Sequence, residues 1–458
     1  MANLVLQNPS IYSYLNLPLG CIEKIEKERR VAPRAPTAAN PQSSSVSITV
    51  IISCKDVRQH RITFQGSSIS EYNIDRALAT LSAYAFPNDP ALLFAFSHSL
   101  PSEPLDLTLV APYEPLAEFS RQGILEVLAA NGEQSLWRIC HANYRYRLCN
   151  TYPEVLVMPR KLTDEDLFVI ANFRSGHRLP TLCWGDRNNG ATMWRASQPK
   201  AGVSGSCSLD EKMLDIIAYS CVYKKTPTGQ IKTVSEPILH IIDCRPKSSA
   251  MANRATGAGY ESQTNYPNTR IEFCNIGNIH VMRDSFRSLA AIFMSPVAAS
   301  NDVNFSKQVE DTQWLTHVRL VLKCAHDTAS LILKGIPVLV HCSHGWDRTA
   351  QVCALAQLLL DPFYRTIDGF KILVEKEWIA FGHQFQLRCG HGQDRANRQE
   401  DQISPIFLQF LDCVWQVVKQ FPHYFEFSAR YLLVIADHLH SCRFGTFLFG
   451  SDLERLRW

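Results

Sequence analysis

A cysteine and an arginine stand six residues apart in the run "VLVHCSHGWDRTAQV", as Cys342 and Arg348. A thiolate is a strong nucleophile, and a planar guanidinium can donate two hydrogen bonds to one phosphoryl group. The pair is therefore suited to the transfer of a phosphoryl group to sulfur, with a phosphocysteine as the intermediate. This chemistry needs neither a metal ion nor another cofactor, and we expect none.

The residues around this pair predict a strand, a loop and a helix. The run "GIPVLV" ahead of Cys342 is short, apolar and partly β-branched, which is typical of a strand buried on both faces. An apolar stripe of helical spacing follows, made of Val352, Leu355, Ala356 and Leu359. In such a loop the backbone N–H groups point inward, and the helix N-terminus adds positive potential. We expect this socket to bind a dianion and to lower the pKa of the thiol from about 8.5.

The spacing alone is weak evidence, because Cys389 and Arg395 in "CGHGQDR" have the same separation. That second pair follows a polar segment and precedes no apolar stripe, so we interpret it as a coincidence within a loop. An isolated cysteine in a cytosolic protein is usually a small buried hydrophobic residue. The strand, loop and helix around Cys342 favour the nucleophile over that alternative.

The composition of the chain limits the classes of protein to which it can belong. Its 458 residues are 46% apolar and 19% charged, which is typical of a globular protein with material for two to three domains. The 46 basic and 43 acidic residues give a formal charge of +3, which argues against nucleic acid as a partner. The 15 cysteines form neither a CxxC pair nor a cluster with metal-ligand spacing, and no leader opens the chain, which indicates a reducing cytoplasmic setting. No apolar run approaches about 20 residues, so we expect any membrane contact to be peripheral.

The N-terminal quarter predicts a small β-rich module. Residues 46–64 alternate between apolar and polar and predict a hairpin, and residues 70–86 predict a helix that ends before Pro87. The segment 29–45 is rich in Pro, Ala and Ser and predicts a long mobile loop. We place this module at residues 1–100 and a linker at 101–115.

The remainder, residues 116–458, predicts one α/β domain. Strand-like runs at 238–244 and 271–282 alternate with helical runs such as 314–335. The last third is mostly helical, with helices expected at 366–381, 406–421 and 429–444.

The run "HCSHGWDRT" resembles the signature of the myotubularin family, the Cys-x5-Arg phosphatases that remove the 3-phosphate from phosphoinositides. Other stretches resemble this family too, and together they extend over nearly the whole chain: "YPEVLVMP", "SQPKAGVSG", "NIHVMRDS", "EKEWIAFGHQFQLRCGHG" and "SPIFLQFLDCVWQ". The resemblance implies a protein-tyrosine-phosphatase-like α/β domain with a central mixed sheet flanked by helices. It also implies that residues 1–100 form a partial PH-GRAM-like domain.

The resemblance implies a role for each residue of the signature. Cys342 would become the phosphocysteine, Arg348 would clamp the phosphate, and Asp347 would protonate the leaving inositol oxygen. An N-cap of the following helix is the alternative role for Asp347. The substrate-binding residues that the resemblance implies are Asn253, Asn278, Ile279, Ser343, His344, Gly345, Trp346, Gln384 and Arg388. An isolated asparagine is more often a turn or cap residue.

Two positions depart from the family pattern. His344 stands where most active members have aspartate, so it removes a negative charge and adds a positive one when protonated near its ordinary pKa of about 6.5. We expect activity to be retained, with tighter substrate binding in acid; a neutral, solvent-facing replacement is the alternative. Gln384 stands where the family has a basic residue, while Arg388 is kept. We therefore expect a preference for the lipid with a single 3-phosphate over the 3,5-bisphosphate.

The sequence thus predicts a phosphatidylinositol 3-phosphate phosphatase, with the 3,5-bisphosphate as a second substrate. We expect it to bind endosomal or vacuolar membranes peripherally from the cytoplasm, alone or as an oligomer with other family members. The main alternative is a catalytically silent member that binds phosphoinositides or acts as a scaffold subunit. A protein phosphatase is disfavoured, because Trp346 and Asp347 add bulk and charge to the loop. The first 100 residues lack the opening strands of a full PH-GRAM domain, and no zinc cluster or coiled coil follows Phe449, which predicts a divergent member or an incomplete sequence.

Overall fold

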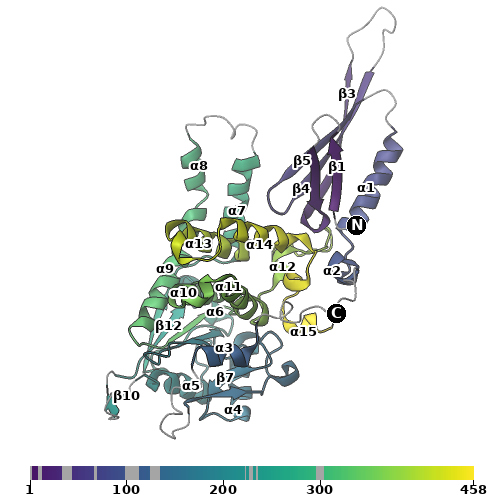
Figure 1. Ribbon diagram of the computed structural model, residues 1–458. Coiled ribbons are helices and arrows are strands. Elements are labelled where there is room, and N and C mark those ends of the chain that lie inside the picture. Colours follow the sequence, from purple (N-terminus) through teal and green to yellow (C-terminus); the bar gives the residue numbers. More distant parts are fainter. Residues whose placement is uncertain are drawn as a thin grey trace, which may run out of the picture.

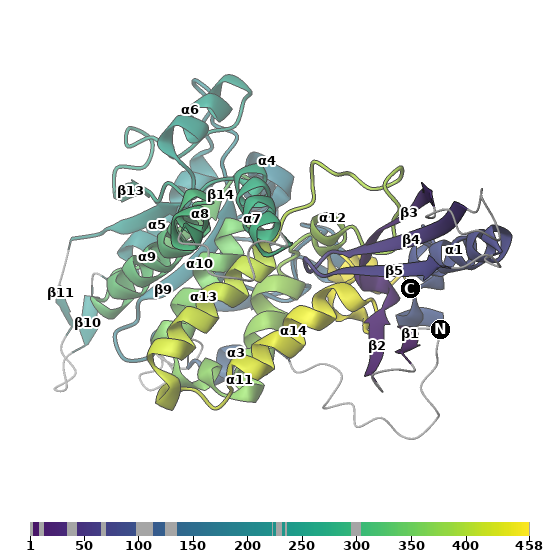
Figure 2. The same cartoon turned by 90° about the horizontal axis from the view of Figure 1, so that it is seen from above.

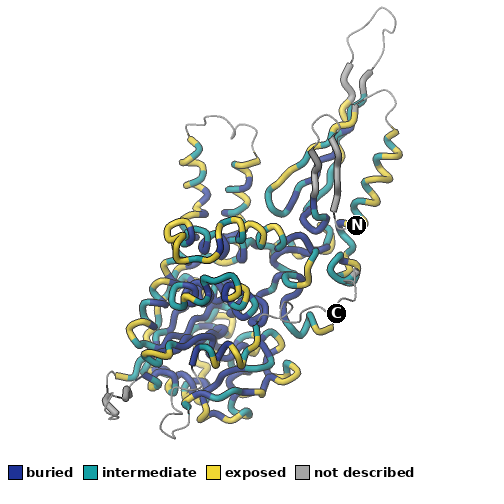
Figure 3. The backbone as a smooth tube through the Cα atoms, viewed as in Figure 1, coloured by how far each residue is buried: buried dark blue, intermediate teal, exposed yellow. Residues whose placement is uncertain are grey.

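The computed structural model describes residues 3–8, 13–33, 44–65, 70–97, 113–123, 135–221, 223–225, 231–233, 236–294 and 304–457. A β-rich module at the N-terminus adjoins a larger domain of sheet and helices (Figure 1). Each of the two parts has a hydrophobic core of its own. In the larger part the central strands and the inner sides of the helices are buried (Figure 3).

The larger domain is built on a five-stranded sheet with the order β13-β12-β14-β9-β8. These strands are β8 Thr181–Gly185, β9 Thr192–Ser197, β12 Leu239–Asp243, β13 Thr269–Phe273 and β14 Val338–Cys342. Neighbours from β13 to β9 run parallel, and β8 pairs antiparallel with β9, so the sheet is mixed. The central strand β14 is buried along its whole length, as its continuous apolar run predicts.

Helices flank this sheet. α9 (Trp314–Leu333) and α10 (Arg348–Leu360) pack together and against β14. α5 (Ser208–Tyr219) packs against β12, with α4 (Asp164–Phe173) beside it. Figure 1 shows these two pairs of helices in separate layers with the sheet between them. The fold predicted for this domain, a mixed sheet flanked by helices, is therefore confirmed.

The helices predicted for the last third are present. They are α11 (Ile367–Val374), α13 (Ile406–Gln420) and α14 (Ala429–Ser441). A π-helix, Glu375–Ala380, continues α11 to the predicted end of that helix. A π-helix widens the turn and often occurs at functional sites. Here the π-helix carries Glu377, whose carboxylate accepts a hydrogen bond from Arg195 on β9.

The N-terminal module contains the predicted hairpin and helix. β3 (Ile22–Pro33), β4 (Ser44–Cys54) and β5 (Gln59–Gln65) form an antiparallel sheet. α1 (Glu71–Ala85) follows, and its N-cap Ser70 accepts a hydrogen bond from the Asn73 N–H. The module lies at one end of the molecule beside α12 (Phe385–Cys389) and α14 (Figure 2).

The loop predicted at 29–45 is wrong at both ends. Residues 29–33 belong to β3 and residues 44–45 to β4, and the two strands pair from Ile22 to Pro33. Strand β3 continues through the two arginines, and pairing with β4 outweighs the turn-forming composition that follows. Residues 34–43 of this prediction lie outside the described residues, as do residues 101–112 of the predicted linker.

The strand predicted at 271–282 is also wrong beyond its first residues. β13 ends at Phe273, and α7 (Ile279–Met294) begins at residue 279. The carboxamide oxygen of Asn278 accepts hydrogen bonds from the backbone N–H groups of His280 and Val281, which caps the helix. A local cap thus starts a helix inside a run that has strand-like composition.

The remaining elements are β1 Asn3–Asn8, β2 Ser13–Pro18, α2 Phe94–Ser97, α3 Pro115–Arg121, β6 Trp137–Cys140, β7 Leu156–Pro159, β10 Tyr223–Lys225, β11 Ile231–Thr233, α6 Lys247–Ala255, α8 Phe305–Asp311 and α15 Asp452–Arg455. Within the described ranges, no helix has the length and apolar character needed to cross a bilayer.

Candidate active site

The reactive cysteine candidate lies at the carboxyl end of the central strand. Cys342 is the last residue of β14 and is 2% exposed. Its Sγ accepts hydrogen bonds from the Gly345 N–H at 3.3 Å and from the Thr349 hydroxyl at 3.2 Å. Burial by itself raises the pKa of this thiol, but the charge of Arg348 and the bonds from Thr349 outweigh burial and lower it below its ordinary value. The loop therefore stabilises Cys342 as a thiolate.

Gly345 gives the loop its shape. Its φ is +76°, and a Cβ at this position would lie 2.3 Å from the Ala196 carbonyl oxygen. A glycine is therefore required here for both backbone conformation and space. The carbonyl oxygen of Gly345 accepts hydrogen bonds from Arg178 Nη2 at 3.0 Å and Arg195 Nη2 at 2.8 Å. With the carbonyl held by these two cations, the N–H of the same residue points at the sulfur of Cys342.

Sequence reasoning missed Arg178 and Arg195, and both are fully buried. Arg178 Nη2 also donates to the Phe381 carbonyl at 2.8 Å, and Arg195 Nη1 donates to the Glu377 carboxylate at 2.6 Å. The sequence contains one indication of this arrangement. Arg195 is a charged residue inside the apolar strand "TMWRAS", and a buried charge requires a partner.

A second group of buried polar side chains anchors the end of β14. His341 Nε2 lies 3.0 Å from Glu261 Oε2, and Arg174 Nη1 donates to the other oxygen of Glu261 at 2.7 Å. Arg174 also forms two hydrogen bonds with Asp210. Burial opposes a charge on the imidazole, but the Glu261 carboxylate raises the pKa of His341. The residue before Cys342 is thereby fixed by a chain of ion pairs.

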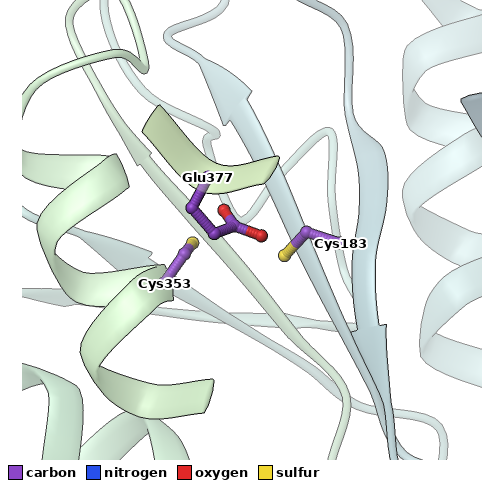
Figure 4. Close-up of side chains that lie close together, drawn as sticks. All are labelled: Cys183, Cys353 and Glu377. Carbon is purple, nitrogen blue, oxygen red and sulfur yellow. The ribbon is translucent and has the colours of Figure 1, made fainter. Parts of the chain in front are cut away.

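One group of potential metal ligands occurs in the described part of the chain. Cys183, Cys353 and Glu377 place their ligand atoms within 4.8 Å of one another (Figure 4). The Glu377 carboxylate already accepts hydrogen bonds from Arg195 at 2.6 Å and from Gln357 Nε2 at 2.8 Å. Because Arg195 already binds the Glu377 carboxylate, we interpret these three side chains as part of the packing behind the loop that contains Gly345, not as a metal site.

Asp347 occupies the N-cap position of α10, but its side chain makes no capping hydrogen bond. Its carboxylate instead accepts two hydrogen bonds from Arg388, from Nε at 2.9 Å and from Nη2 at 2.8 Å. His383 Nδ1 lies 3.3 Å from the same carboxylate. Burial favours the neutral acid, but Arg388 and His383 hold the pKa of Asp347 far below its usual range. The N-cap alternative therefore does not hold for this side chain, and Asp347 is ionised in this arrangement.

Arg348 reaches across to the segment between β13 and α7. Its Nη1 donates to the Ile276 carbonyl at 3.1 Å. Two predicted substrate-binding residues lie just beyond: Asn278 caps α7 with its carboxamide, and the Ile279 carbonyl accepts the Ser404 hydroxyl at 2.7 Å. The cap role that is usual for asparagine is thus the one observed for Asn278.

Asn253 is connected to the loop through one intermediate residue. Its Nδ2 donates to Gln198 Oε1 at 2.9 Å, and the Gln198 N–H donates to the Ser343 carbonyl at 3.2 Å. Ser343 is half-buried within the loop. The structure therefore brings Asn253 to the edge of the site.

The rings of His344 and Trp346 stack on each other, with centroids 4.8 Å apart and planes 12° from parallel. His344 is exposed and Trp346 is half-buried. Desolvation of the ring lowers the pKa of His344, and the cations of Arg178, Arg388 and Arg348 outnumber the opposing Asp347. The expectation of an ordinary imidazole pKa is therefore wrong: the pKa of His344 is lowered, because desolvation and the three nearby arginines disfavour the protonated form.

The side-chain hydrogen bonds of Gln384 do not connect it to Cys342. Its Nε2 donates to the carbonyl oxygens of Gly382 at 2.9 Å and Gly450 at 3.0 Å. The carboxamide thus ties the segment before α12 to the C-terminal segment, whereas Arg388 on α12 reaches Asp347.

The second Cys-x5-Arg pair is a coincidence, as predicted. Cys389 is buried in α12, and burial raises its pKa to about 12. Arg395 is 65% exposed and lies 3.7 Å from Glu400. The raised pKa keeps this thiol protonated, so Cys389 is not activated, in contrast to Cys342.

Comparison with known proteins identifies the family of this chain. The family model for the myotubularin-like phosphatase domain matches residues 93–456. Myotubularin from Rattus norvegicus is 43% identical over 448 residues, covering 97% of this chain and 67% of that protein. The phosphatidylinositol-3,5-bisphosphate 3-phosphatase MTMR2 of Mus musculus is 42% identical over 455 residues, covering 96% of this chain and 63% of that protein. The chain thus spans about two thirds of the length of these relatives. On the family model and these identities together, the chain belongs to the myotubularin family.

Proposed function

We propose that this chain is a phosphoinositide 3-phosphatase that hydrolyses the 3-phosphate of phosphatidylinositol 3-phosphate. The observation that carries the proposal is the environment of Cys342, whose buried sulfur accepts two hydrogen bonds and has a lowered pKa. A buried cysteine without a function has its pKa raised by burial, as Cys389 does. A buried thiolate is unfavourable unless its surroundings stabilise it, and surroundings that do so are typical of a catalytic nucleophile.

The reaction has two steps. The Cys342 thiolate attacks phosphorus, a sulfur–phosphorus bond forms, and the bond from phosphorus to the inositol oxygen breaks. That oxygen leaves with a proton. Water then attacks the phosphocysteine, which releases inorganic phosphate and regenerates the thiolate. Backbone N–H groups of the loop and the Arg348 guanidinium stabilise the charge on the phosphoryl oxygens in both steps.

Asp347 supplies the proton to the leaving oxygen. Its ion pair with Arg388 keeps it ionised before substrate binds. A phosphate dianion near this pair raises the pKa of the carboxylate by charge repulsion and competes for the Arg388 guanidinium. The proton is therefore taken up as substrate binds, and the same residue can activate water in the second step.

The 3,5-bisphosphate is the second candidate substrate, because the MTMR2 relative is named for acting on it. Gln384 carries no charge, and its carboxamide is bound by two backbone carbonyls. A 5-phosphate thus gains no cation at this position, which favours the lipid with a single 3-phosphate.

The rim of the site supports a peripheral membrane enzyme. Residues 198–209 and 245–260 flank the loop and contain no acidic residue. They carry Lys200, Lys247 and Arg254, and Arg254 Nε donates to the Gly202 carbonyl at 2.9 Å. Val203 is 81% exposed and Met251 is 54% exposed on the same rim. Cations beside exposed apolar side chains fit an anionic bilayer surface. Endosomal or vacuolar membranes, which would hold this substrate, are the proposed location.

The N-terminal module is proposed as PH-GRAM-like, since its three-stranded sheet packs with α1 in the manner expected of part of such a domain. Association with other family members is a further proposal that rests on the family resemblance alone.

Release of phosphate from vesicles that each hold one mono- or bisphosphorylated inositide tests the reaction. We expect release from the 3-phosphorylated lipids, no release with Cys342→Ser, and unchanged release with Cys389→Ser as the matched control. Wild-type protein that binds these vesicles without releasing phosphate would favour the silent phosphoinositide-binding member. Faster release from phosphotyrosine peptides than from lipid would favour a protein phosphatase.

A further inference from the structure

Three cysteines outside the site lie close together at the same edge of the sheet. Cys244 follows β12, Cys274 follows β13, and Cys324 faces them from α9. The sulfur atoms of Cys274 and Cys324 are 2.7 Å apart. Cys274 is half-buried and can be reached from solvent, whereas Cys324 is 3% exposed and Cys244 is fully buried.

The Cys274 segment supports the arginine of the site. The N–H of Cys274 donates to the Asp243 carbonyl at 2.8 Å, and the N–H of Ile276 donates to the Cys244 carbonyl at 3.0 Å. The carbonyl of Ile276 then accepts Arg348 Nη1 at 3.1 Å. A restriction on Cys274 therefore acts only two residues from Ile276, whose carbonyl binds Arg348.

We propose that Cys274 and Cys324 are a redox modification site that closes to a disulfide and clamps the Arg348-supporting segment to α9. The oxidant is a hydroperoxide, of which hydrogen peroxide is the simplest. The Cys274 thiol loses its proton, its sulfur attacks one oxygen of hydrogen peroxide, and the oxygen–oxygen bond breaks, which gives a sulfenic acid at Cys274 and releases the other oxygen, with that proton, as water. The Cys324 sulfur then attacks the sulfenic sulfur, the sulfur–sulfur bond forms, and a second water leaves. Overall, two thiols are oxidised and one peroxide is reduced to two waters.

The order of the two thiols follows from exposure. Cys274 is the one that solvent reaches, so it meets the oxidant first. Cys324 is the resolving thiol; burial raises its pKa well above the ordinary value, so closure is faster at pH 8.5 than at pH 7. The sulfur atoms are already in contact, and only a small approach is needed to reach the bond length of about 2.05 Å.

The disulfide joins residues 50 positions apart. It restricts the unfolded chain and leaves the native contacts nearly unchanged, so oxidation should stabilise the protein. We expect the Tm to rise by about 2–4 °C on oxidation, with the reduced value restored by dithiothreitol. The inference concerns thiol chemistry and does not depend on the proposed phosphatase reaction.

Peptide mapping of the full chain tests the proposal directly. Trypsin cleaves after lysine and arginine, so residues 271–283 carry Cys274 alone and residues 324–334 carry Cys324 alone. After treatment with hydrogen peroxide and alkylation of free thiols, we expect these two peptides to be joined without reduction. Joining of residues 233–247 to 324–334 would assign the bridge to Cys244 and overturn the proposal. Full alkylation or sulfinic acid at Cys274, with no joined peptide, would also overturn it.

Variants separate the clamp from general oxidation. Cys274→Ser should lose the joined peptide and the rise in Tm, while Cys207→Ser, which removes another half-buried cysteine, should keep both. The same mapping in a Cys342→Ser background excludes the site cysteine as a partner. A joined peptide without any rise in Tm would show that the bridge forms but does not clamp the segment, which overturns that part of the proposal.

Discussion

The carboxylate of Asp347 and the guanidinium of Arg388 face each other through two parallel hydrogen bonds of 2.9 and 2.8 Å. Both side chains are buried, at 9% and 6% exposure. A bidentate pair of this kind fixes the position of the carboxylate as well as its charge. The Arg388 guanidinium therefore positions Asp347, the proposed proton donor.

The first prediction concerns the stability of this pair. Arg388→Met should lower the free energy of unfolding by about 3–5 kcal/mol at pH 7, because it leaves a buried carboxylate without a partner. The pKa of Asp347 is depressed in the folded protein, so its stabilisation is present above the unfolded pKa of about 3.9. That stabilisation disappears as the pH falls below this value, and the difference between variant and wild type should shrink there. Urea midpoints at pH 7 and in acid measure both effects.

The double variant Arg388→Met with Asp347→Asn is the control for the first prediction. It removes the buried charge together with its partner, so it should regain most of the lost stability at pH 7. Equal urea midpoints for the single and double variants would contradict a role for the unpaired carboxylate.

The second prediction concerns the thiolate. Thr349→Val removes the hydroxyl that donates to Cys342 Sγ at 3.2 Å, so the pKa of the cysteine should rise. A hydrogen bond to a charged group contributes about 1.5–3 kcal/mol, which corresponds to about 1–2 pH units. The rate of alkylation by iodoacetamide as a function of pH measures the change. Thr349→Ser retains the hydroxyl and should behave as the wild type; an equal shift in both variants would assign the effect to packing.

The local features of the site could be predicted from sequence. The strand, the loop, the helix and Cys342 lie within 23 consecutive residues, from Val338 to Leu360, and their pattern needs no distant partner. Arg195 and Glu377 are 182 positions apart, and the fold alone brings them together. No local pattern specifies that pairing. The buried charge on β9 indicates that a partner exists without indicating which residue it is.

At Asp347 a tertiary ion pair replaces the local capping hydrogen bond that the sequence favours. The sequence offers an aspartate at a helix start, and capping is the usual outcome. A cation 41 positions away competes for the same oxygens and forms two bonds with them. At Asn278 the competition has the opposite result, since the carboxamide caps α7 and ends the strand-like run. The deciding factor in both cases is whether a tertiary partner is present.

The third prediction concerns the shape of the loop. Gly345→Ala should reduce phosphate release by at least about 100-fold, because the new Cβ would meet the Ala196 carbonyl at 2.3 Å and displace the N–H that faces Cys342. Gly190→Ala is the matched control, since Gly190 also has a positive φ, +79°, but its Cβ would meet no atom within 4 Å. Comparable losses of activity in both variants would mean that backbone strain, and not the collision, is responsible.

The fourth prediction concerns pH. The pKa of His344 is below its ordinary value, so the imidazole is neutral at pH 7 and gains a proton only on acidification below about 6.5. The KM for lipid should therefore be flat between pH 7 and 8 and should fall only at a pH well below the ordinary imidazole pKa, once the cation forms beside the anionic substrate. His344→Asp carries a negative charge throughout this range and should not show the fall. KM values with the same pH dependence in both proteins would argue that His344 has no electrostatic role.

The fifth prediction concerns the missing cation at residue 384. Gln384→Arg should increase kcat/KM for the 3,5-bisphosphate about 10-fold or more relative to the 3-phosphate, since one contact to a charged group contributes about 1.5–3 kcal/mol. The substitution also breaks the two bonds from the carboxamide to Gly382 and Gly450, which by itself loosens the C-terminal segment. Gln384→Met breaks the same bonds without adding charge and is the matched control. If methionine changes the ratio of the two kcat/KM values as much as arginine does, the segment and not the charge determines the preference. If neither variant changes the ratio, residue 384 does not reach the 5-phosphate.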